Sequence, residues 1–381
     1  MRVIQLILLV IIVLSCKNKE VREPDSDFNQ EKLVFKIDSL YQKYYKENGP
    51  GAAILITFKG QKIVNKGYGL RNLETKQPIT SSTNMRSGSL AKQFTALGLL
   101  KLQEQGKLSL KDTAYRYLQI PSLKDITIEQ LISHTSGLED AEYVFEKEWD
   151  SSHYVNNQDI IQWYSNNSLY QFRPGARFEY NNGAYYILAG IIEAVSGMPF
   201  RAFMKGEVFE AIGMSRTSFI DMENPELIEE KALCYEKDSL GDWQAMEGQH
   251  LDNLLGAGGI YTNLNDYFTY LSALRNGEIW DKESLEFIFN PISMNIELHS
   301  EDMSFLKGKE SSYTLGWEVT DSLAVSAGSY SGVNNWVIFE RKRPLNIVIF
   351  TNNDILFKEK LVDKTYQLVD AHFDKCCSQF P

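Results

Sequence analysis

A serine and a lysine three residues apart are the side chains in this sequence best suited to chemistry. Ser89 and Lys92 lie in the stretch RSGSLAKQFTA, and in a helix this spacing places both side chains on one face. A serine hydroxyl becomes a good nucleophile when a nearby base accepts its proton, and burial favours the neutral lysine amine that can act as that base. The pair therefore predicts nucleophilic catalysis. The alternative is a helix that Ser89 caps while Lys92 lies on its surface.

Tyr180 and Asn182 form a second candidate group, in the stretch FEYNNG. A tyrosine oxygen near a nucleophile can act as a base or pass a proton to the leaving group. An asparagine amide can hold a lysine and a substrate carbonyl in place. The alternative is a packed tyrosine followed by an asparagine that caps the next helix.

His134 and Ser136 look like a further base with its nucleophile, in the stretch SHTSGL. Neighbours in a turn usually point apart, however, and polar residues in turns hydrogen-bond to the local backbone. We therefore predict a structural, hydrogen-bonding turn at these two residues.

The elements that must position these side chains are strands near both chain ends and helices between them. Strands are predicted over residues 52–58, 62–68, 313–319, 323–326, 335–341 and 345–351, and helices over residues 31–48, 185–195 and 357–373. This order predicts an α+β fold in which an antiparallel sheet from both chain ends is flanked by helices and encloses a large helical region. The polar, irregular residues 139–168, together with residues 250–259, are predicted to form the walls of the site.

Composition and charge exclude several classes of partner. Of the 381 residues, 43% are hydrophobic, enough for a sizeable core. The formal net charge of −11 argues against nucleic acid as a partner, because phosphate binding needs a basic face. The chain has no Cys-x-x-Cys, His-Glu-x-x-His or Gly-x-x-x-x-Gly-Lys motif, and its histidines are scattered. We therefore expect no metal and no cofactor, and the sequence carries no indication of an oligomeric state.

Over residues 31–375 the chain resembles the penicillin-recognising serine hydrolase family, which contains class C β-lactamases, D,D-peptidases and related esterases. SLAK within RSGSLAKQFTA is similar to the family's Ser-x-x-Lys motif, and YNN within PGARFEYNNGAYYILAGIIEAVSG is similar to its Tyr-x-Asn motif. The stretches LQEQGKLSLKD, ITIEQLISHTSGL, GAGGIYTNLNDY and YTLGW follow in the family's order. The resemblance implies the α/β sandwich of β-lactamases and transpeptidases over residues 31–381.

The resemblance also implies roles for individual residues. Ser89 would form an acyl-enzyme, Lys92 would accept or relay its proton, Tyr180 would serve as base or proton donor, and Asn182 would position Lys92 and the substrate. The backbone N–H groups of Ser89 and Ser329 would form the oxyanion hole.

The third motif departs from the family pattern. The family has Lys-Thr-Gly or His-x-Gly on the strand that lines the site, and here the sequence reads Ser326-Ala327-Gly328. The glycine is kept, but Ser326 stands where a cation or an imidazole is expected in the substrate-binding strand. A neutral hydroxyl gives a substrate carboxylate neither a charge nor a bidentate contact. The change weakens a β-lactamase or D,D-carboxypeptidase activity more than ester or amide hydrolysis.

The N-terminus is similar to that of bacterial lipoproteins. A short apolar run over residues 3–14 follows Arg2 and ends in VLSC, which resembles a lipobox. The resemblance implies a signal peptide over residues 1–15, a lipid on Cys16 that anchors the protein to a membrane of the cell envelope, and a polar tether over residues 16–30. The alternative is an ordinary cleaved signal or an uncleaved anchor.

Two functions follow from these patterns. The first is a lipid-anchored serine hydrolase that acts on a small-molecule or peptide substrate, an ester or an amide, through acyl-Ser89. The second, prompted by Ser326, is a catalytically impaired relative that binds a cell-wall fragment or a protein partner without turnover.

Overall fold

An antiparallel sheet of eight strands, in the order β10-β11-β12-β13-β14-β15-β1-β2, forms the centre of the computed structural model. The structure describes residues 30–149, 153–167, 170–222, 227–278, 293–294, 296 and 303–377. The strands of this sheet are β1 (Ala52–Phe58), β2 (Gln61–Tyr68), β10 (Ser293–Met294), β11 (Ser312–Thr314), β12 (Trp317–Val319), β13 (Leu323–Tyr330), β14 (Val333–Glu340) and β15 (Leu345–Thr351). Strand β1 pairs with β15 along its whole length, from Ala52 opposite Thr351 to Phe58 opposite Leu345. The predicted α+β fold with a sheet from both chain ends is therefore confirmed.

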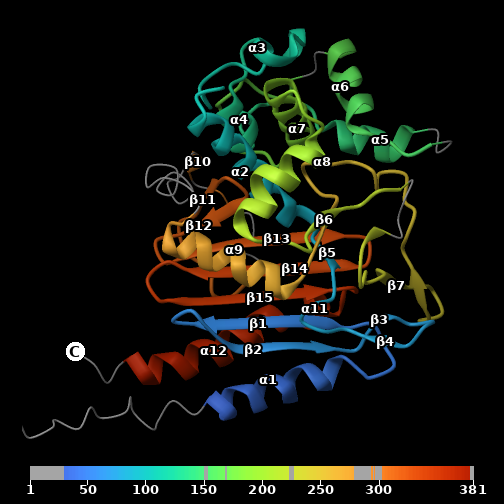
Figure 1. Ribbon diagram of the computed structural model, residues 1–381, viewed down its shortest axis with the longest axis vertical. Helices are drawn as coiled ribbons and strands as arrows, with labels where there is room; N and C mark the ends of the chain where they lie inside the picture. The colour runs from blue at the N-terminus through green and yellow to red at the C-terminus, as the bar shows by residue number, and fades with distance from the viewer. Residues whose placement is uncertain are drawn as a thin grey trace, which may run out of the picture.

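Helices cover both faces of the sheet (Figure 1). Helices α1 (Gln30–Tyr44) and α12 (Leu361–Cys377) pack on one face, and α2 (Ala91–Glu104), α7 (Asn182–Ser196) and α9 (Leu264–Asn276) lie on the other. Along β1, Ile54 contributes to the core under α1 and α12, whereas Ala53 and Leu55 contribute to the core under α2 and α7. Burial of both faces explains the apolar run over residues 52–56 of this strand.

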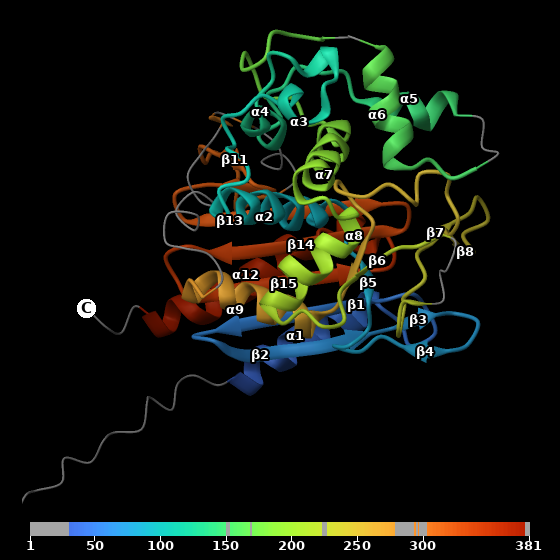
Figure 2. The same cartoon turned by 45° about the horizontal axis from the view of Figure 1, so that its top comes forward.

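Most of the remaining helices pack around the core under α2 and α7, whereas α11 (Ile355–Lys358) contributes Leu356 to the core under α1 and α12. The helices are α3 (Tyr115–Leu118), α4 (Ile128–Ile132), α5 (Ala141–Glu148), α6 (Asn157–Asn166), α8 (Phe200–Phe203) and α11, with 3₁₀ turns at Gly88–Leu90 and Pro121–Leu123 and a π-helical segment at Met204–Glu210. Two-stranded sheets pair β3 (Leu70–Asn72) with β4 (Gln77–Pro78) and β7 (Tyr235–Lys237) with β8 (Trp243–Ala245), and a third sheet has the order β5 (Met85–Arg86), β9 (Ile260–Thr262), β6 (Ser218–Phe219). Figure 2 shows α3 to α6 grouped at the end of the molecule away from α1.

Two predicted elements are each divided by a tight turn. Residues 313–319 form β11 and β12 rather than one strand, because Leu315 (φ 45°) and Gly316 (φ 88°) have left-handed backbone conformations. A Cβ at Gly316 would lie 2.6 Å from the backbone nitrogen of Gln93, so this turn approaches α2 at a place where only glycine fits. The predicted helix over residues 357–373 begins late for a similar reason, since Lys360 (φ 51°) separates α11 from α12.

The predictions for the N-terminus lie outside the described residues, which begin at Gln30. The signal peptide, the lipid on Cys16 and the tether therefore stay predictions. Within the described residues, no single helix is long and apolar enough to cross a membrane; by length and composition alone, α7 and the following Phe200–Glu210 pass as a pair bent by 77°.

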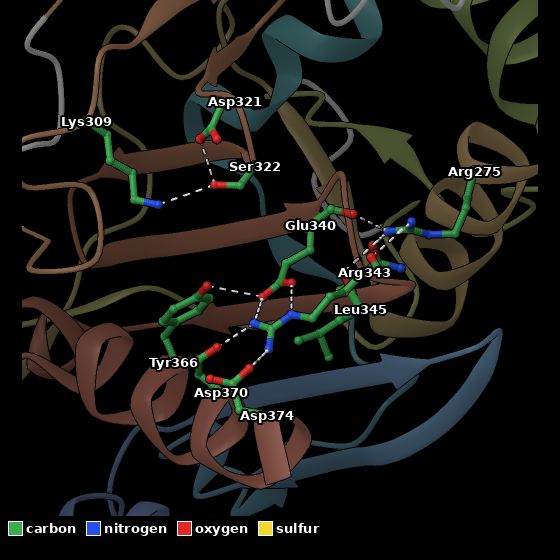
Figure 3. Close-up of polar contacts among 11 residues, drawn as sticks. Arg275, Lys309, Asp321, Ser322, Glu340, Arg343, Leu345, Tyr366, Asp370 and Asp374 are labelled. Atoms are coloured by element: carbon green, nitrogen blue, oxygen red, sulfur yellow. Dashed lines mark hydrogen bonds and ion pairs between the residues drawn. The ribbon is translucent and has the colours of Figure 1, made fainter. Parts of the chain in front are cut away.

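A charged network fastens the C-terminal helix to the sheet (Figure 3). Arg343 follows β14 and donates hydrogen bonds to Glu340, at 2.6 Å from Nη2 to Oε1, and to Asp374, at 2.6 Å from Nη1 to Oδ1. It also contacts Asp370. The hydroxyl of Tyr366 on α12 donates to Glu340 Oε1 at 3.1 Å. Because the Glu340 side chain is only 4% exposed, Arg343 is the cation that compensates a buried carboxylate.

Replacement of this arginine is expected to destabilise the fold. Arg343→Met should lower the free energy of unfolding by about 2–4 kcal/mol, since it leaves Glu340 as a buried charge without its main partner. Urea unfolding followed by circular dichroism measures the difference. Lys342→Met is the matched control, because Lys342 pairs with Asp321 at 2.7 Å where both side chains are exposed (65% and 71%), and no change is expected there. Equal midpoints and slopes for the two variants would contradict a structural role for the network.

Candidate active site

The turn that carries Ser89 is held from two sides. The N–H of Ser87 donates to the carbonyl of Ile260 on β9 at 2.8 Å, and the side-chain amide of Asn335 on β14 donates to the carbonyl of Arg86 at 2.7 Å. Gly88 has a φ of 57°, which redirects the chain from β5 into the 3₁₀ turn Gly88–Leu90 and then into α2. Ser89 is half-buried on this turn and faces a cavity. The backbone thus presents its hydroxyl at the end of a buried helix.

Lys92 lies within α2 and is 1% exposed. Its Nζ donates to Ser89 Oγ at 3.1 Å, to Asn182 Oδ1 at 2.6 Å and to the carbonyl of Ala257 at 3.2 Å. All three acceptors are uncharged oxygens. The Tyr180 ring adds a cation–π contact, with its centroid 4.8 Å from Nζ. The structure therefore brings Ser89, Lys92, Tyr180 and Asn182 together and excludes the alternative of a surface lysine.

Two adjacent asparagines at the start of α7 have different roles. Asn181 caps the helix, because its side chain accepts a hydrogen bond from the N–H of Ala184 at 2.8 Å. The first helical residue, Asn182, is thereby free to point its side chain at Lys92. The N–H groups of Asn182 and Gly183 both donate to the carboxylate of Asp140, at 2.8 Å each. The predicted alternative of a capping asparagine is thus realised by Asn181 and not by Asn182.

His134 supports the Tyr180 segment and does not serve Ser136. Its Nδ1 accepts the N–H of Asn181 at 3.1 Å, and its ring lies 4.4 Å from the Tyr180 ring, centroid to centroid. Burial, with a further contribution from the charge of Lys92, holds the pKa of His134 well below its usual value, so the ring is a neutral acceptor. Ser136 Oγ accepts from the N–H of Leu138 at 3.4 Å. These contacts agree with the predicted structural turn, and they add a positioning role that the sequence had not suggested.

Strand β13 lies directly against the turn that carries Ser89. A Cβ at Gly88 would lie 3.0 Å from the backbone nitrogen of Ser329, and one at Gly328 would lie 2.2 Å from the carbonyl oxygen of Ser87. Two facing glycines thus let the N–H of Ser329 approach Ser89, where an oxyanion hole needs it. Ser326 also faces the cavity, but its hydroxyl donates to the carbonyl of Gly316 at 2.8 Å and so holds the β11–β12 turn.

Gly328 offers a test of this close approach. Gly328→Ala is expected to slow covalent labelling of Ser89 by about 10²-fold, because the added methyl group must push β13 away from the turn. Time courses with a fluorophosphonate probe measure the rate. Gly206→Ala is the control, since a Cβ there meets no atom within 4 Å, and its labelling rate should equal that of the unmodified protein. An unchanged rate for Gly328→Ala would show that the site tolerates a displaced strand.

Two cavities meet at Ser89 and Ser329. The described residues that line the first cavity are Ser89, Tyr180, Tyr313, Gly316, Glu318, Val325, Ser326, Ala327 and Ser329. Among these described residues, Glu318 supplies a carboxylate, and none is a lysine, an arginine or a histidine. The second cavity lies on the Asn182 side, where Glu142 and Leu251, Leu254 and Ala257–Gly259 line it. Parts of both segments predicted as walls, residues 139–168 and 250–259, therefore do border the site.

The described residues contain no group of three or more histidine, cysteine, aspartate or glutamate side chains that could hold a metal ion. Arg86, which lines the second cavity, is paired with Asp252 at 2.8 Å, and both side chains are buried. Ser89, Lys92 and Asn182 contact one another through a hydroxyl, an amine and an amide, which are proton donors and acceptors suited to acyl transfer.

Comparisons with known proteins agree with this geometry. The family model described as Beta-lactamase matches residues 37–371. Penicillin-binding protein 4* of Bacillus subtilis is 27% identical over 317 residues, which cover 79% of this chain and 68% of the relative. The octameric penicillin-binding protein homologue from Pyrococcus abyssi is 24% identical with a TM-score of 0.75 (89% and 76% of the chains). The D-amino acid amidase from Ochrobactrum anthropi SV3 is 20% identical with a TM-score of 0.74 (89% and 99%).

Proposed function

The chain belongs to the beta-lactamase family of serine hydrolases, and we propose that it hydrolyses an ester, an amide or a peptide through an acyl-enzyme on Ser89. The observation that carries this proposal is the buried Lys92 amine, 3.1 Å from Ser89 Oγ and 2.6 Å from Asn182 Oδ1, in a site that Tyr180 lines. A serine beside a buried lysine is a nucleophile with its proton acceptor.

In the proposed reaction, Lys92 first loses the proton that its cationic form carries. Ser89 Oγ then attacks the carbonyl carbon while its own proton passes to the neutral Lys92 amine, directly or by way of Tyr180. The N–H groups of Ser89 and Ser329 stabilise the negative charge on the carbonyl oxygen. When the intermediate collapses, the bond to the leaving group breaks, and Tyr180 returns a proton to the leaving oxygen or nitrogen. Water then attacks the acyl-enzyme by the same route in reverse, which releases the acid and restores Ser89.

The lining of the first cavity supports a substrate without a carboxylate at this position. Ser326 lies where the family pattern has a cation or an imidazole, and the described lining includes the Glu318 carboxylate. A carboxylate on the substrate would find no charge-assisted partner among these residues. We therefore favour simple esters and amides over penicillins and peptides that end in a free carboxylate. An amide is also the kind of substrate for which the similar D-amino acid amidase from Ochrobactrum anthropi SV3 is named.

A mass-shift screen of the full chain tests the proposal. The protein is incubated with p-nitrophenyl butyrate, phenylalanine amide, benzylpenicillin and a D-alanyl-D-alanine peptide, and intact mass is recorded. An adduct of the acyl mass on the Ser89 peptide, with the ester or the amide ahead of penicillin, is the expected result. If no compound and no fluorophosphonate probe forms an adduct, the proposal is overturned. Binding without turnover would then favour the second function, a non-catalytic receptor, which Ser326 alone suggests.

A further inference from the structure

A carboxyl group outside the four proposed catalytic residues contacts the site directly. Glu142, in the first turn of α5, accepts a hydrogen bond on Oε1 from Asn182 Nδ2 at 2.9 Å, and its Oε2 accepts one from the hydroxyl of Tyr186. It lines the second cavity together with Ser89. Ser89, Lys92, Asn182 and Glu142 thus form one continuous chain of hydrogen bonds.

The two ends of the Asn182 amide are not interchangeable in this chain. Its oxygen accepts from Lys92, and its NH₂ group donates to Glu142. If the amide flipped, the NH₂ group would face the donors of Lys92, and the oxygen would face the Glu142 carboxylate. Both contacts would be lost, so Glu142 fixes the orientation that gives Lys92 its shortest hydrogen bond.

We propose that Glu142 is a positioning residue for acylation of Ser89, which orients the Asn182 amide toward Lys92 and, through its own ionisation, makes acylation depend on pH. This inference rests on the proposed function of Ser89. An ionised Glu142 lies two hydrogen bonds from Lys92 and stabilises the positive charge that Lys92 gains when it accepts the serine proton. Acylation should therefore be faster when Glu142 is ionised.

The charges around Glu142 place its ionisation in an accessible range. Burial and the nearby Asp140 raise the pKa of Glu142 to about 7, against the opposing effects of Lys92 and of the hydrogen bond from Asn182. The titratable groups that face Glu142 from its own segment and from α2, α6, α7 and β13 are Asp140, Glu146, Lys92, Tyr164, Tyr186 and Tyr330. From β5, Arg86 lines the same cavity and is paired with Asp252. Among these, Asp140 and Glu146 oppose the ionisation of Glu142, whereas Lys92 favours it.

Two substitutions of Glu142 distinguish its effect on the orientation of the Asn182 amide from the effect of its charge. In Glu142→Gln, the amide oxygen still accepts from Asn182 and the amide NH₂ can donate to the Tyr186 oxygen, so orientation is kept and charge is removed. In Glu142→Ala, the acceptor itself is lost. Labelling rates of Ser89 with a fluorophosphonate probe are measured from pH 5 to pH 9 for both variants. Glu146→Gln is the control, since Glu146 lies exposed on the same helix and acts on Glu142 only through its charge, as the smallest of the effects on the pKa of Glu142.

The unmodified protein should label faster as pH rises, with a midpoint near the raised pKa of Glu142, about 7. Glu146→Gln should keep this rise, with its midpoint shifted slightly lower because the Glu146 charge contributes to the raised pKa of Glu142. Glu142→Gln should lose this midpoint, and Glu142→Ala should label about tenfold more slowly or worse at every pH. A midpoint that survives in Glu142→Gln overturns the ionisation role, and a normal rate in Glu142→Ala overturns the positioning role. A Glu142→Gln variant that changes only KM for an amine-bearing substrate, with kcat unchanged, would instead make Glu142 a substrate contact.

Thermal unfolding tests the ionisation of Glu142 and its contact with Asn182 without any labelling of Ser89. It therefore remains informative if Ser89 is never labelled, a result that would overturn the proposed function itself. The pKa of Glu142 in the folded protein lies above its ordinary value of 4.5. The folded state therefore binds the proton more tightly, and stability is lost as pH rises from below 4.5 through the raised pKa. The Tm of the unmodified protein should fall relative to Glu142→Gln over that range. The Tm losses of Glu142→Ala and Asn182→Ala should be non-additive in the double variant. A constant Tm difference refutes the ionisation role, and additive losses refute the orienting contact.

Discussion

Replacement of Ser89 by alanine is expected to abolish covalent labelling of the chain and to lower the hydrolysis of any substrate by at least about 10³-fold. Ser89 is the serine whose Oγ lies within hydrogen-bond distance of the buried Lys92 amine. Without that oxygen no acyl bond forms, whichever residue accepts the proton. The fold should be unaffected, because the substitution removes one hydroxyl from a half-buried position.

Ser136→Ala is the matched control for this experiment. Ser136 is the other serine that the sequence places beside a polar partner, His134, but its Oγ accepts a hydrogen bond from the local backbone N–H of Leu138 at 3.4 Å. Intact-mass spectra after probe treatment should therefore show a full adduct for Ser136→Ala and none for Ser89→Ala. An adduct that persists on Ser89→Ala would place the nucleophile elsewhere and remove the basis for the proposed reaction.

The sequence could predict the sheet and the catalytic helix because their signals are local. The apolar runs of β1 and β15 mark strands buried on both faces, and such runs are recognisable without knowledge of their partners. The spacing of Ser89 and Lys92 needs only helical geometry to place both on one face. Even so, the pairing of β1 with β15 joins residues about three hundred positions apart, and its prediction depended on the order of elements along the whole chain.

The parts of the site that the sequence did not reveal come from long-range contacts between polar residues in loops. Glu142 reaches Asn182 across 40 positions, and His134 reaches Asn181 across 47. Neither contact has a periodic signal, since both depend on where irregular loops are folded. The N-cap of α7 could not be assigned from the sequence, because either of two adjacent asparagines at a helix start can be the cap. The extended backbone of Asn181, at φ −146° and ψ 112°, identifies Asn181 as the cap.

Lys92→Met is expected to slow labelling of Ser89 by at least about 10³-fold while leaving the chain folded, because methionine fills a similar volume without a proton acceptor. Asn182 Oδ1 and the Ala257 carbonyl lose a donor, at about 1–3 kcal/mol for each unsatisfied group. Removal of a buried amine offsets part of this cost. Labelling time courses together with urea unfolding measure both effects. Lys101→Met on the same helix is the control, since Lys101 is 30% exposed and pairs only weakly with Glu104, at 3.9 Å.

Lys92→Arg then distinguishes proton transfer from charge alone. Arginine keeps a positive charge near Ser89 and Tyr180 but does not give up its proton in proteins. If Lys92 accepts the serine proton, the arginine variant should be as slow as the methionine variant. If it labels markedly faster, Lys92 acts only as a fixed charge, and the proton must go to Tyr180, which lines the same cavity as Ser89. Tyr180→Phe would in that event be the variant that loses labelling, whereas with Lys92 as the base it should retain a measurable rate of acylation.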